Sequence, residues 1–394
     1  MFLSFFFAAF VILLSAVYAN AQEHRSNQRH DSNQWFHPRD HPVHQLFRRD
    51  DATTDGATYP QVGSPAWTAA YPASTPNSAK LPAAWTDALS AAVAAGSIPD
   101  IPPSKIAAPN TSPVYPEGYD PTSPKVCSGT YKCRIPGDMW DAPDGYIGMG
   151  FDDGPTDDFL EDKNQRVTHF MIGCNMLSQP ALLTRAMDLG DDIAVHTWTH
   201  PYMTTLSNED VLAQLGWTLQ VIHDSSGGRL SKFWRPPYGD TDVRVSAIAK
   251  EVFGLETILW NRDTEDWSLT SGGTTDEAIQ NSMTEWLSGP KSPGLIILEH
   301  ELSTPSVRAF EHAYPLMKSN GWNLLSVTQA VATDGSAYQN AYSIDSGEVT
   351  PADVVSGNLT TTSISTASSA TTSTSSTTTR SSTSLSRSSS STLS

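Results

Sequence analysis

The chain has 394 residues, of which 17% are charged, and its formal net charge is −18 at pH 7. The acidic residues are spread along the chain rather than gathered in blocks, which argues against nucleic acid and anionic membranes as partners. A neutral or cationic polymer would suit this charge, although simple solubility explains it equally well.

The first 21 residues have the features of a secretory signal peptide. Phe2–Ala16 is an apolar run that is short for a membrane span, and Ala19-Asn20-Ala21 supplies small residues for cleavage before Gln22. Position and cleavage site disfavour the alternative of a buried helix. We therefore expect a secreted protein, in the extracellular space or the cell wall.

Residues 22–49 are polar and rich in histidine, and they end at the dibasic pair Arg48-Arg49. Because processing proteases cut at such pairs, we interpret this stretch as a pro-segment. Its histidines lack regular metal-ligand spacing. A solvated, disordered leader is the simpler interpretation.

Residues 50–141 form an extension rich in Pro, Ala, Ser and Thr, in which only Leu81–Ala95 has a helical pattern. In a secreted chain, the close spacing of Cys127 and Cys133 predicts a small disulfide loop. A zinc site there is less favoured because other ligands are scarce nearby. Cys174 is expected to be an unpaired, buried thiol.

The far end of the chain, residues 346–394, is almost pure Ser and Thr. Such a segment cannot form a core, and its composition is that of an O-glycosylated stalk. No hydrophobic tail follows it, so we expect no glycolipid-anchor signal. Sequons at Asn110 and Asn358 predict N-linked glycans.

From residue 142 to 332, apolar runs alternate with amphipathic patterns, which predicts repeated strand–helix units. The predicted strands are Tyr146–Phe151, Val167–Ile172, Asp192–Val195, Lys232–Trp234, Glu256–Trp260, Leu295–Leu298 and Trp322–Val327. The predicted helices are Asp158–Lys163, one capped by Ser207 that stops at Gly227-Gly228, Asp242–Glu251, Thr275–Leu287 and Ser306–Lys318.

Polar motifs follow these strands at their carboxyl ends. Asp152 and Asp153 end the first strand, and His196 and His200 follow the third at the spacing that puts both on one face of a helical turn. One carboxylate and two imidazoles make a three-ligand set for a catalytic divalent metal with a position open for water. The second carboxylate is free to act as base, so the pattern predicts metal-assisted hydrolysis.

Each polar motif alone has a simpler explanation. An isolated His-x-x-x-His is more often surface or core than ligand, Asp266 could cap a helix, Trp267 could pack in a core, and Arg235-Pro236-Pro237 could be a rigid turn. The motifs all lie at strand ends, where the catalytic residues of a (β/α) barrel converge. Their co-occurrence therefore favours the catalytic interpretation.

Taken together, the motifs resemble the polysaccharide deacetylase family (NodB homology domain), most closely fungal chitin deacetylases. The likeness covers residues 142–332 and implies an α/β fold, a distorted (β/α) barrel with fewer strands than a complete eight, between disordered terminal extensions. The matching motifs are Phe151-Asp152-Asp153-Gly154-Pro155, His196-Thr197-Trp198-Thr199-His200, Arg235-Pro236-Pro237-Tyr238, Asp263-Thr264-Glu265-Asp266-Trp267 and Leu298-Glu299-His300.

The resemblance implies a metal centre and a base. Asp153, His196 and His200 are the expected ligands of one divalent metal ion, usually zinc, with cobalt as the alternative. Asp152 is the expected general base, which takes a proton from metal-bound water. Arg235 is expected to pair with Asp152 and fix its orientation.

The remaining motifs imply an acid and a substrate pocket. His300 is the expected general acid for the leaving amine, and Asp266 is expected to hold it protonated. The backbone N–H of Tyr238 would stabilise the oxyanion. Trp267 and Leu298 would wall a small pocket for the acetyl methyl group.

The implied reaction removes acetyl groups from the N-acetylglucosamine units of chitin, giving chitosan. Acetyl xylan esterase is a rival of the same fold, because amide and ester cleavage pass through one kind of oxyanion. A non-catalytic wall protein that holds polysaccharide is a rival of another class, disfavoured because binding needs no acid, base or metal. We expect chitin or a related N-acetylated polysaccharide as partner, no transmembrane segment, and a monomer.

One departure from the family pattern concerns residues 156–166. Only about a dozen residues separate Pro155 from Val167, which is near the minimum for a parallel crossover, and the family usually has a longer segment here. Either the loop beside the active site is trimmed, or the sequence has lost a piece.

Overall fold

The computed structural model describes residues 43, 46, 47, 59–109, 111–156, 163–333 and 335–339. The signal peptide, most of the pro-segment, the Ser/Thr tail and the sequons at Asn110 and Asn358 lie outside these residues, as does nearly all of the predicted helix Asp158–Lys163. Among the described helices, none is long and apolar enough to cross a membrane.

The main sheet has eight strands within the described residues, and every pairing in it is parallel. Seven pair in the order β7-β6-β5-β4-β3-β9-β8, and β10 pairs with the first half of β3. The strands are β3 (Tyr146–Asp153), β4 (Thr168–Met171), β5 (Asp192–Val195), β6 (Phe233–Trp234), β7 (Glu256–Thr257), β8 (Arg262–Asp263), β9 (Leu295–Leu298) and β10 (Asn323–Ser326).

The two ends of this strand order are joined by one short stretch of chain. β7 pairs with β6 and β8 pairs with β9, while only residues 258–261 separate β7 from β8. Ile258 N donates to Trp234 O at 2.9 Å, and Asn261 N donates to Ile296 O at 3.0 Å. The stretch therefore closes the sheet into a ring, which confirms the expected distorted barrel.

A buried apolar cluster fills this barrel with side chains from successive strands. Phe170, Ala194, Phe233 and Ile296 come from β4, β5, β6 and β9, and all are at most 1% exposed. Strands buried on both faces are typical of parallel sheets covered by helices. Because the strands are parallel, their carboxyl ends, with the polar motifs, lie at one end of the barrel.

The longer helices that follow the strands lie where the sequence patterns predicted them. α7 begins after Ser207, whose Oγ accepts from Asp210 N at 3.1 Å. α8 ends at Phe253, two residues beyond the predicted end, and Gly254 follows it with φ 64°. The described helices here are α5 (Gly173–Ser178), α6 (Pro180–Asp188), α7 (Asn208–Ser225), α8 (Val243–Phe253), α9 (Asp276–Ser288), α10 (Thr304–Ser319) and α11 (Val327–Val331).

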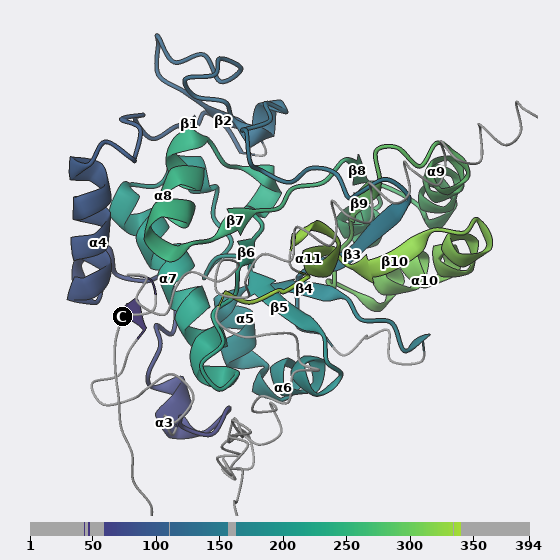
Figure 1. The fold of residues 1–394 in the computed structure, drawn as a ribbon, viewed down its shortest axis with the longest axis horizontal. Coiled ribbons are helices and arrows are strands. Elements are labelled where there is room, and N and C mark those ends of the chain that lie inside the picture. The colour runs from purple at the N-terminus through teal and green to yellow at the C-terminus, as the bar shows by residue number, and fades with distance from the viewer. Residues whose placement is uncertain are drawn as a thin grey trace, which may run out of the picture. The chain divides into compact units, whose positions relative to one another are not determined.

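The N-terminal extension packs onto the barrel helices. It contains α3 (Pro65–Thr68), α4 (Ala83–Ala94) and the short antiparallel pair β1 (Lys105–Ile106) and β2 (Pro113–Val114). In Figure 1, α4 lies alongside α8 and α7. Trp85 of α4 is fully buried, and its ring meets that of Phe253 edge-on at 5.8 Å. The extension is thus part of the folded unit.

Two apolar residues of the predicted pro-segment also lie in this core. Val43 and Phe47 are 0% and 3% exposed, and the Phe47 ring lies 5.9 Å from Trp85. Trp85 Nε1 donates to Leu46 O at 3.3 Å. The interpretation of a solvated leader is therefore wrong for these residues, because isolated apolar side chains in a polar stretch give no periodic signal from which to predict a contact.

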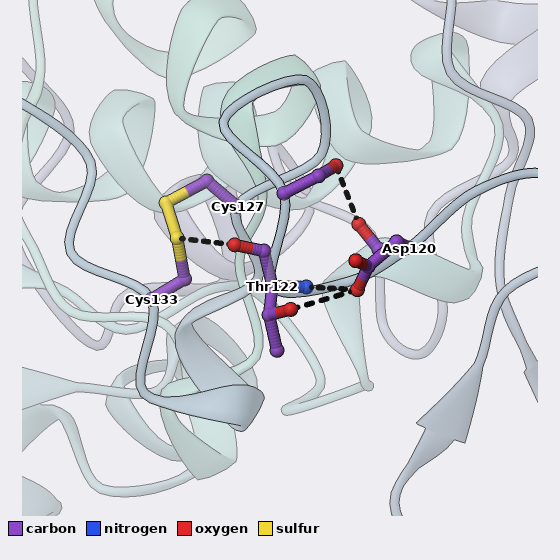
Figure 2. The surroundings of a disulfide bond; sticks show 5 residues. Asp120, Thr122, Cys127 and Cys133 are labelled. Atoms are coloured by element: carbon purple, nitrogen blue, oxygen red, sulfur yellow. Dashed lines mark hydrogen bonds between the residues drawn. A yellow bond between two sulfur atoms is a disulfide. The ribbon is translucent and has the colours of Figure 1, made fainter.

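The disulfide between Cys127 and Cys133 is present, as predicted, with Cα atoms 5.0 Å apart (Figure 2). Beside it, Asp120 Oδ1 accepts from both N and Oγ1 of Thr122 at 2.8 Å. Cys174 is unpaired, also as predicted, but it is half-buried rather than fully buried. The disulfide loop lies against the chain that follows Tyr238, since Gly129 N donates to the carbonyl of Thr241 at 2.8 Å.

Candidate active site

Three predicted metal ligands converge at the carboxyl ends of β3 and β5. Asp153 is the last residue of β3, and His196 directly follows β5. Asp153 Oδ1 lies 3.3 Å from His196 Nε2 and 3.2 Å from His200 Nε2. One ligand atom of each residue lies within 4.8 Å of the others, so the structure brings together the ligand set that the sequence predicted.

The two histidines are brought together by a loop, and the expected helical turn is wrong. Thr197 and His200 have φ of 66° and 59°, and a left-handed residue cannot continue a right-handed helix. His200 N donates instead to Thr197 Oγ1 at 3.1 Å. The spacing of four residues between His196 and His200 therefore corresponds to a tight loop in this protein and not to a helical turn.

The chemistry of this donor set fits a divalent metal ion. Asp153 Oδ1 is buried, accepts no geometrically sound hydrogen bond among the described residues, and faces two imidazole nitrogens. Burial alone would raise the pKa of Asp153, but His196 and His200 outweigh it and hold the pKa well below its usual range. A carboxylate with two imidazoles is an established ligand set for catalytic metals.

Contacts that the sequence analysis did not predict hold the ligand loop in place. The carbonyl of Arg235 lies 2.8 Å from His196 Nδ1 and accepts its N–H, which leaves Nε2 free to bind a metal. Gln214 Oε1, on α7, accepts from the backbone N–H groups of Trp198 and Thr199, both at 2.9 Å. The sequence analysis missed Gln214, whose only signal is a polar side chain on the buried face of a helix.

The predicted base is oriented as expected. Arg235 Nη1 donates to Asp152 Oδ1 at 2.7 Å, and both side chains are buried. The guanidinium of Arg235 lies 4.1 Å from the centre of the Phe170 ring, which gives this buried cation a second partner. Asp152 Oδ2 lies 3.8 Å from His196 Nε2, so the base carboxylate borders the metal site.

The predicted acid lies on the backbone segment next to the base. Asp152 N donates to Glu299 O at 2.9 Å, and Glu301 N donates to Asp152 O at 3.0 Å, which places His300 beside Asp152. Asp266 Oδ1 is 2.7 Å from His300 Nδ1. Burial alone would lower the pKa of His300, but Asp266, together with Asp152 and Asp153, outweighs it and raises the pKa to about 9.

The expected substrate-contacting residues lie as follows. Tyr238 is 52% exposed, and its ring lies 4.6 Å from that of His200. Trp267 is 53% exposed and follows Asp266, while Leu298 is buried at the end of β9. Tyr238 also stacks on Tyr202 at 4.1 Å, a partner that the sequence analysis missed. The roles of these residues in binding substrate stay predictions.

A buried charged group beneath the site was also missed. His169 of β4 lies between Glu301 and Asp191, and all three side chains are nearly inaccessible. Burial alone would lower the pKa of His169, but Glu301 and Asp191 outweigh it and raise the pKa to about 10. A histidine within an apolar strand looks like ordinary core in the sequence, because its partners are 22 and 132 residues away.

A metal-ligand set with a neighbouring base and acid defines a metal-dependent hydrolase. The family model for polysaccharide deacetylases matches residues 141–257. Chitin deacetylase 3 of Cryptococcus neoformans var. neoformans is 39% identical over 359 residues, 88% of this chain and 82% of that protein. The chain belongs to the polysaccharide deacetylase family.

Two further proteins are similar to this chain over about half of its length. Chitin deacetylase 1 of Cryptococcus neoformans var. grubii is 37% identical over 235 residues, 54% of this chain and 48% of that protein. The solved chitin deacetylase of Colletotrichum lindemuthianum is 22% identical, with a TM-score of 0.45 over 52% of this chain and 95% of that one.

Proposed function

We propose that the protein is a metal-dependent chitin deacetylase, which hydrolyses the N-acetyl groups of N-acetylglucosamine units in chitin and releases acetate. One observation carries the proposal. Asp152, oriented by Arg235, and His300, paired with Asp266, lie on adjoining backbone beside the Asp153–His196–His200 site. A binding protein needs no such base and acid. The named relatives supply the substrate class.

The residues divide the proton transfers between them. A bound divalent metal would polarise the attacking water and the acetyl carbonyl. Asp152 accepts the proton of the attacking water through Oδ2, because Oδ1 is held by Arg235. His300 gives a proton from Nε2 to the leaving amine, because Nδ1 is held by Asp266.

We propose zinc as the metal, because a carboxylate with two imidazoles and an open position is a zinc donor set, with cobalt as the alternative. The composition of the N-terminal 21 residues supports secretion to the extracellular space or cell wall. We propose that the enzyme acts as a monomer on a polysaccharide rather than on nucleic acid.

Acetate release tests the proposal. The purified full chain is incubated with soluble chitin oligomers and, in parallel, with acetylated xylan, before chelation, after it, and after zinc is restored. We expect release from the chitin oligomers that chelation abolishes and zinc restores. Faster release from xylan would make it an acetyl xylan esterase, and no release from either, with oligomer binding intact, would make it a non-catalytic binding protein.

A further inference from the structure

The tryptophan between the two histidine ligands is held by the N-terminal extension. Trp198 is fully buried, and its indole N–H donates to the carbonyl of Ser74 at 3.1 Å. Its ring centroid lies 6.2 Å from that of Tyr71. The indole also covers Gly173, where a Cβ atom would overlap the ring. One face of the ligand loop is thus supported from outside the barrel domain.

The supporting segment is itself anchored on α7. Tyr71 Oη donates to Asp224 Oδ2 at 3.0 Å, and Trp67 Nε1 donates to Ser225 Oγ at 3.0 Å. The rings of Trp67 and Tyr71 meet edge-on at 5.5 Å. These bonds join residues more than 150 positions apart, and both use the last turn of α7. Ser74 is therefore fixed relative to the barrel.

The backbone of the ligand loop depends on such support. Gly173 N and Cys174 N donate to the carbonyls of Thr197 and Trp198, at 2.9 and 3.0 Å. Thr197 and His200 have positive φ, a conformation that costs free energy and persists only when the surroundings impose it. Trp198 lies between the two histidine ligands in the sequence. Rotation of its indole would therefore remove one of the contacts that hold the loop in this conformation.

We propose that residues 67–74 are a positioning element of the metal centre, which fixes Trp198 and through it the directions of His196 and His200. The inference rests on the metal-dependent function proposed above. It extends the site to a segment that lies 78 or more residues before Asp152 and outside the matched family domain. Groups that orient metal ligands typically change metal affinity by about 10–100-fold when they are removed.

Zinc affinity of the full chain tests this, measured by competition with a chromophoric chelator and without substrate. Trp198→Phe keeps a ring but loses the N–H that Ser74 accepts, and we expect its zinc dissociation constant to rise about 10-fold. Trp322→Phe is the matched control, because it loses a buried indole N–H bond to a backbone carbonyl, that of Leu287, outside both this segment and the ligand loop. We expect its dissociation constant to stay within about 2-fold of wild type.

Unfolding of the metal-free proteins separates positioning from general destabilisation. We expect the two variants to have similar midpoints. If Trp198→Phe does not fold, Tyr71→Leu removes the neighbouring ring without changing the loop, and we expect the same loss of zinc affinity. Wild-type zinc affinity in the variant that folds, or an equal loss in Trp322→Phe, would overturn the inference. A wild-type chain that binds no zinc or cobalt would overturn the proposed function itself.

Discussion

Asp266 binds both the side chain and the backbone of His300. Its Oδ1 lies 2.7 Å from His300 Nδ1, and its Oδ2 accepts from His300 N at 2.8 Å. One carboxylate thus sets the position of the imidazole and its charge. Nε2 is left as the only ring nitrogen that can give a proton to substrate.

Replacing Asp266 should therefore move the pH profile. In Asp266→Asn the pKa of His300 should fall from about 9 toward its ordinary 6.5, because only the charges of Asp152 and Asp153 then offset burial. The acid form is lost as pH rises through this pKa, so the alkaline limb of kcat should move to lower pH. The profile of kcat against pH on a chitin oligomer checks this, and an unmoved alkaline limb would show that another group is the acid.

Substitution of the two neighbouring acids, Asp152 and Asp153, should show that they have different functions. Asp152→Asn should lower kcat by about 10²–10⁴-fold while zinc still binds, because a carboxamide cannot accept the proton. Asp153→Asn is the comparison and should lose zinc. Measured together, kcat and zinc content decide the assignment. Loss of zinc from Asp152→Asn would make Asp152 a ligand, and activity within a few-fold of wild type would remove it from the mechanism.

The buried His169–Glu301 pair should stabilise the fold. Glu301→Gln leaves His169 with one of its two carboxylates, and Glu301 directly follows His300, the proposed acid. Removing one partner of a buried pair costs about 3–5 kcal/mol. Denaturant unfolding of Glu301→Gln, His169→Phe and the double variant measures this. A double variant as unstable as the sum of the two would contradict a direct coupling.

This pair also predicts a dependence of stability on pH. The pKa of His169 is raised from 6.5 to about 10, so the folded state holds a proton that the unfolded state has lost between these values. The contribution is complete below about pH 6.5 and disappears as pH rises through about 10. Unfolding midpoints from pH 6 to 10 should fall in wild type and fall less in His169→Phe.

The disulfide should be present in the purified protein and should stabilise it. A non-reduced digest should contain a peptide pair linked through Cys127 and Cys133, with Cys174 free. Replacing both linked cysteines by Ser should cost about 2 kcal/mol of unfolding free energy, since the closed loop is short. Cys174→Ser is the control. A cross-link that includes Cys174 would refute the pairing.

The Ser/Thr tail should be dispensable for activity, whereas Phe47, near the N-terminal end, should be needed for stability. Deleting residues from Ser356 onward should leave acetate release from soluble chitin oligomers unchanged, because a Ser/Thr tract has little apolar surface with which to dock. Phe47→Ala should instead cost about 3–5 kcal/mol, because the ring is buried against Trp85 and Phe253. Thermal unfolding and oligomer assays check both. A Ser356 truncation with little activity would show that the tail contacts the catalytic domain.

Much of the site could be predicted from the sequence. Parallel strands bring their carboxyl ends to one rim of a barrel, so polar residues after apolar runs predict which side chains meet. Asp152, Asp153, His196, Arg235 and His300 were located in this way, with the family resemblance supplying their roles. Leu295–Leu298 was predicted to the residue because an all-apolar run of strand length has few other interpretations.

The tertiary structure alone decided the features that depend on distant residues. The loop at Thr197 needs positive φ, which residue spacing does not encode and which the surrounding contacts impose. Trp198 depends on Ser74, and Glu301 on His169, across 124 and 132 residues of sequence. A local pattern reports which face of a helix or strand is apolar, whereas these partners are selected by packing once the barrel has closed.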